Sequence, residues 1–221
     1  MDQRPSVRRG QLWTLLILLA VLAPSAGCRS ALATAVWLIR GPNLPAEFKE
    51  LKGKRVCMVC RPLVELTYRD SSVAKDLARE MNKLLAANVR DIEMIDQRKV
   101  DEWIDENVWE EYNQVGRALK ADYVVGVDLE RFSIFQGQTV YQGKANVALK
   151  VFDCNSQSRE PVFERRLPQV VYPPNSPRST GDQQESDFRR EYVRVLADQL
   201  ARHFYPHDPY ADVALDAAYL H

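Results

Sequence analysis

The sequence predicts one α/β domain, a mixed sheet that contains a long antiparallel hairpin and has helices packed against it. Two observations lead to this prediction. Apolar segments of strand-like and helix-like period follow one another along residues 51–205, in the order strand, helix, strand, helix, helix, strand, strand, strand, helix. Two long strand-like segments, 121–135 and 139–153, are separated only by the tight turn at 136–138.

A buried strand and an amphipathic helix open the domain. Residues 54–61 (KRVCMVCR) are apolar on both faces, which indicates a strand that is covered on both sides. Ser71 or Ser72 is expected to cap the helix that follows. The inward face of this helix is apolar at helical spacing. It consists of Val73, Leu77, Met81, Leu84 or Leu85, and Asn88.

A short strand and two further helices come next. Residues 91–95 (DIEMI) form the strand, and Asp96 caps a brief helix behind it. Asn107 and Glu110 have the spacing of a capping box, so another helix is expected to begin there. Its inward face is Val108, Trp109, Tyr112, Val115 or Gly116, and Leu119.

The hairpin 121–153 supplies the strongest internal evidence for the sheet. In residues 139–153 apolar side chains take the odd positions and polar ones most of the even positions, which is the period of a half-buried strand. A three-residue turn brings the apolar faces of the two strands together. The expected pairs are Val125 with Leu149, Val127 with Val147, Leu129 with Ala145, Asp128 with Asn146, and Glu130 with Lys144.

A third strand, a loop and a last helix complete the domain. The strand is expected at 161–171, and the proline-rich segment 172–182 reads as an exposed loop. Ser186 caps the final helix, which Pro206 and Pro209 end. The inward residues of this helix are Phe188, Tyr192, Val195 or Leu196, Leu200 and Phe204.

The amino terminus has the layout of a secretory signal. Three arginines precede the apolar run 12–23, and small residues then lead to Cys28. The order Ser25-Ala26-Gly27-Cys28 resembles the lipobox of bacterial lipoproteins, although Ser25 stands where that family usually has leucine. The resemblance implies that Cys28 carries lipid and begins the mature chain. Two alternatives remain open, a retained anchor helix and cleavage after Ala33.

These features divide the chain into four parts. Residues 1–27 are the signal peptide, 28–50 a lipid-anchored linker, 51–205 the domain and 206–221 a tail. The apolar stretch 31–39, which contains one tryptophan, either lies at the membrane interface or packs on the domain. The expected location is the cell membrane or outer membrane, facing the periplasm.

Composition excludes several classes of function. Without residues 1–27 the chain loses three of its 30 basic residues and one of its 30 acidic residues, which leaves a net charge of −2. This charge gives no basis for a nucleic-acid surface. Cys57, Cys60 and Cys154 remain in the mature chain besides Cys28, and an odd number argues against a disulfide framework.

Two pairs of residues have the spacing of metal or redox sites. Cys57 and Cys60 form Cys-x-x-Cys, but residues three apart on a strand point to opposite faces, which favours two structural thiols. His203 and His207 have ligand spacing, but Pro206 breaks the helix between them. We therefore expect no metal and no cofactor.

One pair of carboxylates could serve acid–base catalysis. Asp128 and Glu130 share a strand face, and the expected register explains them equally as cross-strand contacts on a wet face, with Lys144 opposite Glu130. No nucleophile with an evident base accompanies them. We therefore expect no catalytic residues and no enzyme.

The proline-rich loop is the candidate for partner contact. Proline holds a segment extended at low entropic cost, and Tyr172 offers an aromatic anchor next to Pro173, Pro174 and Asn175. The alternative is a plain connection to the last helix.

Residues 54–153 resemble a known family. The segments KRVCMVCRP, IEMIDQRKVDEW, VGRALKADYVVGVDL and YQGKANVALKVFD resemble, in order, the lipoprotein superfamily of the curli secretion channel and the penicillin-binding-protein activator. The Tol-system amino-terminal domain is a more distant relative, and lipoproteins of planctomycete-type bacteria look closer. The resemblance implies an envelope protein that binds partners or assembles into pores, without catalysis. The chain lacks membrane-crossing hairpins, which disfavours a pore.

Together these observations predict a non-catalytic lipoprotein, anchored to the membrane by lipid on Cys28, that binds another envelope protein. A subunit of an oligomeric secretion or transport assembly is the second reading. An envelope enzyme is the third.

Overall fold

The computed structural model describes residues 43–62 and 71–209. The predicted signal peptide, Cys28 and the stretch 31–39 lie outside the described residues, as does the end of the tail. In the part of the chain that is described, no helix combines the length and the apolar character needed to cross a bilayer.

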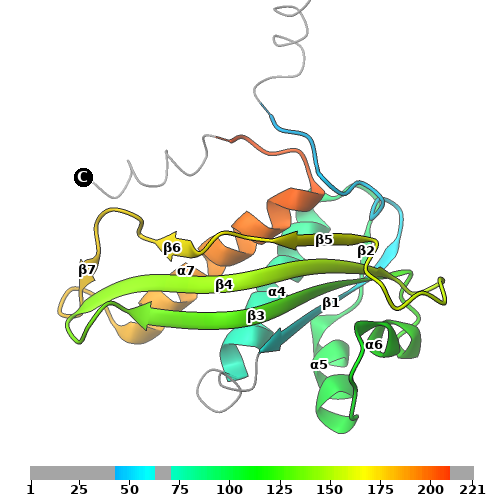
Figure 1. Ribbon diagram of the computed structural model, residues 1–221, viewed down its shortest axis with the longest axis horizontal. Coiled ribbons are helices and arrows are strands. Elements are labelled where there is room, and N and C mark those ends of the chain that lie inside the picture. The colour runs from blue at the N-terminus through cyan, green and yellow to red at the C-terminus, as the bar shows by residue number, and fades with distance from the viewer. Residues whose placement is uncertain (1–42, 63–70, 210–221) are drawn as a thin grey trace, which may run out of the picture. The chain divides into compact units, whose positions relative to one another are not determined.

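A seven-stranded mixed sheet organises the domain (Figure 1). Its order is β2-β1-β3-β4-β5, and β6 and β7 also pair with β4. β1 is parallel to β2 and β3, and the other pairs are antiparallel. The strands are β1 Arg55–Pro62, β2 Glu93–Met94, β3 Tyr123–Phe135, β4 Val140–Asp153, β5 Phe163–Arg166, β6 Val170–Tyr172 and β7 Arg178–Ser179.

Helices cover both faces of this sheet. α4 and α7 pack together behind the hairpin β3–β4 in Figure 1, over one apolar cluster, and α5 and α6 cover a smaller cluster on the other face. The mixed sheet, the long hairpin and the packed helices confirm the predicted fold class. The helices are α4 Ser71–Asn88, α5 Gln97–Glu106, α6 Tyr112–Ala118 and α7 Glu185–Ala201, followed by the 3₁₀ turn η1 Arg202–Phe204.

The predicted core faces are confirmed for β1 and for most of α4 and α7, but Asn88, expected on the inward face of α4, is exposed, and Val89 is buried instead. Residues Val56 to Val59 of β1 have no exposed surface, so this strand is buried on both faces, as its continuous apolar run indicates. The helix faces around Leu77 and Leu196 are equally buried. Burying a side chain of this size contributes about 1.5–3 kcal/mol, so these faces hold the helices to the sheet.

The hairpin register differs from the prediction by two residues. Val127 pairs with Leu149 and Leu129 with Val147, because the connection takes residues 136–139 and is closed by the Gln136 N–Val140 O hydrogen bond of 2.9 Å. A shift of two residues keeps each side chain on its face, so the apolar faces still meet from Tyr123 to Leu129. Between irregularities at Leu129/Arg131 and Ser133/Phe135 the shift is three residues, with Phe132 opposite Ala145.

The predicted start of the third helix is wrong. Asn107 ends α5, with its backbone N–H bonded to Trp103 O at 3.1 Å, and Val108 is fully exposed. The capping residues are Glu111 and Gln114, whose Oε1 accepts the Glu111 N–H at 3.2 Å. The pair Glu111 and Gln114 has the same spacing as Asn107 and Glu110, four residues further along the chain. The local sequence pattern fits both pairs, so packing of the helix against the sheet determines which pair forms the cap.

Smaller differences concern the end of the domain. The strand expected at 161–171 is divided into β5 and β6, both antiparallel to β4. α7 begins at Glu185 with Gln184 as the cap residue, just before the expected Ser186. Asp96 caps α5 as predicted, because its side chain accepts the Arg98 N–H at 3.0 Å.

The folded unit begins before the expected boundary at residue 51. Leu44 and His207 exchange two backbone hydrogen bonds of 2.8 and 3.1 Å. Phe48 is 7% exposed, and its ring packs against the rings of Tyr123, Phe163 and Phe204. The end of the expected linker and the start of the expected tail therefore belong to the domain.

Candidate functional site

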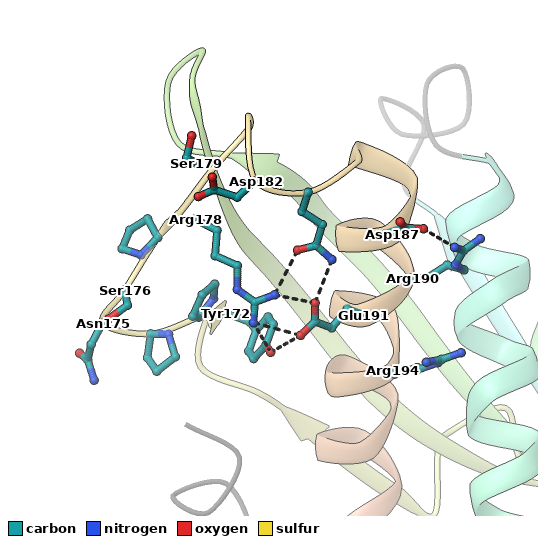
Figure 2. Close-up of a pocket in the computed structure, with 14 residues that line it drawn as sticks. Tyr172, Asn175, Ser176, Arg178, Ser179, Asp182, Asp187, Arg190, Glu191 and Arg194 are labelled. Atoms are coloured by element: carbon teal, nitrogen blue, oxygen red, sulfur yellow. Dashed lines mark hydrogen bonds and ion pairs between the residues drawn. The ribbon is translucent and has the colours of Figure 1, made fainter. Parts of the chain in front are cut away.

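A groove of about 1050 Å³ lies between the segment after β6 and the first half of α7. Residues 173–179 form one wall, and Asp187, Arg190, Glu191 and Arg194 of α7 lie along the other (Figure 2). The groove therefore contains the segment in which partner contact was predicted.

Ion pairing ties the two walls of the groove together. Arg178 of β7 donates from both terminal nitrogens to the carboxylate of Glu191, at 2.7 and 3.1 Å. Tyr172 donates its hydroxyl to the same carboxylate at 2.6 Å, and Gln183 adds a bond of 3.3 Å. Figure 2 shows Arg178, Tyr172 and Glu191 meeting between the loop and the helix. The network holds the loop at a fixed distance from α7.

The Glu191 carboxylate stays ionised. Burial would raise the pKa of Glu191, but the hydrogen bonds from Arg178, Tyr172 and Gln183 outweigh it and hold the pKa below its ordinary range. The pKa of Arg178 is correspondingly raised, since the hydrogen bonds that it donates to Glu191 and the negative charge of Glu191 outweigh burial. A two-point contact between a guanidinium and a carboxylate is among the stronger polar interactions of proteins.

The expectation that Tyr172 lies in an exposed loop is wrong. Its side chain is 5% exposed, and its ring stacks on those of Phe188 and Tyr192 beneath the groove. Pro173 is also buried, and its carbonyl accepts a hydrogen bond of 3.2 Å from Gln142. The tyrosine therefore anchors the segment to its own domain. Partner contact at Pro174 and Asn175, which are exposed, stays a prediction.

A glycine allows α7 to approach the sheet under the groove. A Cβ atom at Gly143 would lie 2.5 Å from the ring of Tyr192, closer than any real contact. The Tyr192 hydroxyl in turn donates to Val170 O at 2.9 Å. The α7 wall of the groove can lie this close to β4 only because residue 143 is a glycine.

The charges of the groove balance. Three of its lining residues are arginines and three are acidic, and Arg190 pairs with Asp187. Arg194 and Asp182 are exposed and have no ion pair among the described residues. This balance suits a polar, roughly neutral occupant better than a strongly charged one.

The carboxylate pair considered for catalysis is separated. Asp128 is 9% exposed and accepts from Tyr112 at 2.7 Å, from Arg61 at 2.9 Å and from Lys150 at 3.0 Å. Glu130 instead pairs with Arg166 at 3.0 Å. The expected pairing of Asp128 with Asn146 and of Glu130 with Lys144 on a wet face is therefore wrong, because the two-residue shift places Ala148 opposite Asp128.

Asp128 is a structural carboxylate in this setting. Burial would raise its pKa, but hydrogen bonds from Tyr112 and Lys150 and the Arg61 charge outweigh it and hold the pKa below its ordinary value. A small pocket of about 130 Å³ adjoins the cluster, and neither Asp128 nor Glu130 lines it. The aspartate has no proton to donate near neutral pH, and its contacts join β1, β3, β4 and α6.

The thiols lie where the strand period places them. Cys57 belongs to the cluster under α5 and α6, whereas Cys60 packs against the larger cluster under α4 and α7, so the two point to opposite faces. Burial raises the pKa of both, and it raises the pKa of Cys154 to about 11. Across the described ranges, no group of three or more His, Cys, Asp or Glu residues could hold a metal ion.

Comparison with known proteins gives a limited result. No family model and no curated protein matches the chain. Three similar solved structures are the PelC dodecamer from Paraburkholderia phytofirmans (11% identity, TM-score 0.43), a minor lipoprotein from Acinetobacter baumannii (18%, 0.38) and lipoprotein GNA1162 from Neisseria meningitidis (8%, 0.40). They cover 73%, 72% and 66% of this chain and 93%, 99% and 97% of their own. Two of the three are bacterial lipoproteins.

Sequence reasoning did not find Arg178 and Glu191. They lie 13 residues apart, on β7 and α7, and β7 is only two residues long. No local pattern marks either residue. Pairing of β7 with the start of β4 brings them together, with Tyr141 opposite Arg178.

Proposed function

We propose that this protein is a non-catalytic lipoprotein of the bacterial envelope, anchored by lipid on Cys28, that binds an extended segment of another envelope protein in the groove beside α7. The observation that carries the proposal is the groove itself. Its proline-rich wall is fixed to α7 by the contacts of Glu191 with Arg178 and Tyr172.

The groove is organised before any partner arrives. Residues 174–177 are exposed, and two of the four are prolines, which lose little conformational freedom on binding. The strongest charges of the site already neutralise each other across the groove. An extended polypeptide offers backbone donors and acceptors without net charge, which matches such a surface.

The anchor follows from the sequence around Cys28. Residues 29–43, fifteen in all, separate this cysteine from the start of the folded unit at Leu44. Fully extended, they reach about 50 Å. The domain would therefore work close to the membrane that carries its lipid.

Photo-crosslinking in the native cell tests the groove. A photo-reactive residue in place of Ser176, in the exposed wall, is expected to yield a discrete crosslinked protein on irradiation. The same substitution at Gln157, an exposed residue outside the groove, is the matched control. Equal products at both positions, or none at either, would contradict a partner in the groove.

Two variants connect the crosslink to the proline wall. The double change Pro174→Gly and Pro177→Gly is expected to remove the Ser176 product, because the wall loses its extended form. Pro168→Gly changes an exposed proline outside the groove and is expected to keep it. Native mass measurement of the complex distinguishes a single partner from a ring of identical subunits, which would favour the oligomeric assembly.

The anchor has a test of its own. The intact mass of natively expressed protein is expected to show a lipidated chain that begins at Cys28, and Cys28→Ala is expected to release the protein from the membrane fraction. An unmodified chain that begins elsewhere would contradict the anchor and leave the groove assignment standing.

A further inference from the structure

Unpaired lysines gather at one end of the domain. Lys49, Lys52 and Lys54 lie in the segment that leads into β1, and Lys120 lies in the turn before β3. All four side chains are exposed, and none has an ion pair or hydrogen bond among the described residues. We call these four residues the lysine face.

Strand direction brings the two segments of the lysine face together. β1 and β3 are parallel neighbours, so the turns that precede them meet at the same end of the sheet. Arg55 connects them, because its carbonyl accepts the Asp122 N–H at 2.7 Å and its guanidinium donates to Lys120 O at 3.3 Å. The lysine face is therefore one surface.

The chain that leads to Cys28 leaves the domain at this same end. The ring of Phe48 packs on Tyr123, the first residue of β3, and Glu47 donates its backbone N–H to His203 O at 2.9 Å beyond the end of α7. Figure 1 shows this segment beside the end of α7, with the start of β1 close to it. A tether through residues 29–43 therefore starts next to the lysine face.

Acidic residues at this end are engaged within the domain. Glu47 pairs with Arg165 at 3.3 Å and with His203 at 3.2 Å. Asp153, opposite Tyr123, accepts the Asn155 N–H at 2.8 Å. The other acidic residues have contacts as well, whereas the four lysine side chains have no ion pair or hydrogen bond among the described residues. These contacts are Glu50 with the Tyr123 hydroxyl, Glu93 with Arg55, and Asp122 with the Arg55 N–H and Asn155.

We propose that the lysine face rests on anionic lipid headgroups of the membrane that holds the lipid anchor. The proposal rests on the anchor at Cys28 put forward above. Each lysine near an anionic bilayer strengthens binding about fivefold, and this attraction falls with ionic strength. Acyl chains and a basic surface are complementary anchoring signals.

The contact would set the direction of the groove. β4 runs from the groove, where Val140 pairs with Ser179, to the tether end, where Asp153 pairs with Tyr123. Its 14 residues span about 45 Å. With the lysine face on the headgroups, the groove points away from the bilayer, toward other envelope proteins.

Chemical labelling of lysines tests this arrangement. The lipidated protein, purified from its own membrane, is reconstituted into phosphatidylglycerol–phosphatidylethanolamine vesicles and, separately, into phosphatidylcholine vesicles. An amine-reactive reagent is applied, and labelling of each lysine is read by mass spectrometry. We expect the lysine face to be protected in the anionic vesicles only. Lys99 on α5 and Lys144, which lies on β4 opposite Val171, also have no ion pair among the described residues and are the internal controls.

A triple variant separates charge from simple proximity. Lys49→Gln, Lys52→Gln and Lys54→Gln together are expected to restore the labelling of Lys120 in anionic vesicles, and high salt is expected to do the same to the native protein. The paired change Lys99→Gln and Lys144→Gln is expected to leave Lys120 protected.

The outcomes are distinguishable. Equal labelling in both kinds of vesicle, or protection that survives the triple variant, overturns the lysine face as an anionic-lipid contact. An unmodified intact mass contradicts the anchor and this proposal together. A lipidated protein with unprotected lysines contradicts this proposal alone and leaves the groove untouched.

Discussion

Tyr172 shows how one residue type can serve two opposite purposes. An aromatic residue before two prolines is typical of a contact surface, yet here its ring stacks under α7 and its hydroxyl binds Glu191. The loop that follows is fastened to α7 through this buried tyrosine. The residue therefore supports the groove from beneath, and the exposed prolines after it form the wall.

Asp128 makes the stability of the protein depend on pH. Its pKa is below the ordinary value of 3.8 in the folded protein, so its contribution is fully present above that value and is lost as the pH falls through the lowered pKa. Replacing it as Asp128→Asn is expected to cost about 1–3 kcal/mol near neutral pH, since charge-assisted hydrogen bonds are weakened.

Urea unfolding at neutral pH and at about pH 3 measures this effect. The difference between the native protein and Asp128→Asn is expected to shrink in acid, because the pH then lies below 3.8, the ordinary pKa of an aspartate, and approaches the lowered pKa of Asp128. Glu191, whose pKa is likewise lowered, contributes acid sensitivity of the same sign that both proteins retain. A difference that stays constant with pH would contradict the assignment.

Two elements, β7 and α7, decide whether the groove exists. β7 has two residues and is held by β4 on one side and by the Arg178–Glu191 contact on the other. Such a short strand has little stability of its own. The position of the groove wall therefore depends on the Arg178–Glu191 contact between β7 and α7.

Glu191→Gln is expected to loosen the wall without unfolding the domain. The amide keeps the size of the side chain but loses its charge, so the contacts with Arg178 and Tyr172 weaken. Hydrogen exchange of residues 174–179 is expected to accelerate, while exchange in α4 stays unchanged. Glu185→Gln, which removes an exposed ion pair to Arg189 on the same helix, is the control. Unaltered exchange at 174–179 would show that the wall does not depend on Glu191.

At the scale of the molecule, the two proposed functional surfaces lie at opposite ends of β4. The groove lies where β4 begins, and the tether segment and lysine face lie where β4 ends. The tether segment is also part of the core through Phe48. Force or motion transmitted through the tether would therefore reach the sheet directly.

Phe48→Ala tests whether the domain begins before residue 51. The ring is 7% exposed among three other aromatic rings, so its removal is expected to cost about 3–5 kcal/mol. Phe135→Ala, at a ring that is 40% exposed, is expected to cost much less. Denaturant unfolding of both variants makes the comparison. If Phe48→Ala lowers the free energy of unfolding as little as Phe135→Ala does, Phe48 lies outside the cooperative unit.

The period of the side chains predicted most of the fold. Faces around Leu77, Leu149 and Leu196 follow from spacing alone, because each element must bury its apolar side whatever its neighbours are. The same logic separated Cys57 from Cys60. The side-chain period did not determine the register of the hairpin, since a shift of two residues satisfies the same apolar pattern.

The groove depended on tertiary structure. The exposed prolines were predicted as a contact, but Arg178 and Glu191 are joined only by strand pairing, and no local rule connects them. Tyr172 supports the loop because its ring is buried. Asp128 is also buried, and it contacts Tyr112, Arg61 and Lys150. By itself the sequence determined which residues avoid water and, through the segment around Cys28, where the protein is expected to work. The tertiary structure decided which polar groups contact one another, because these groups belong to different strands and helices that are separated along the chain.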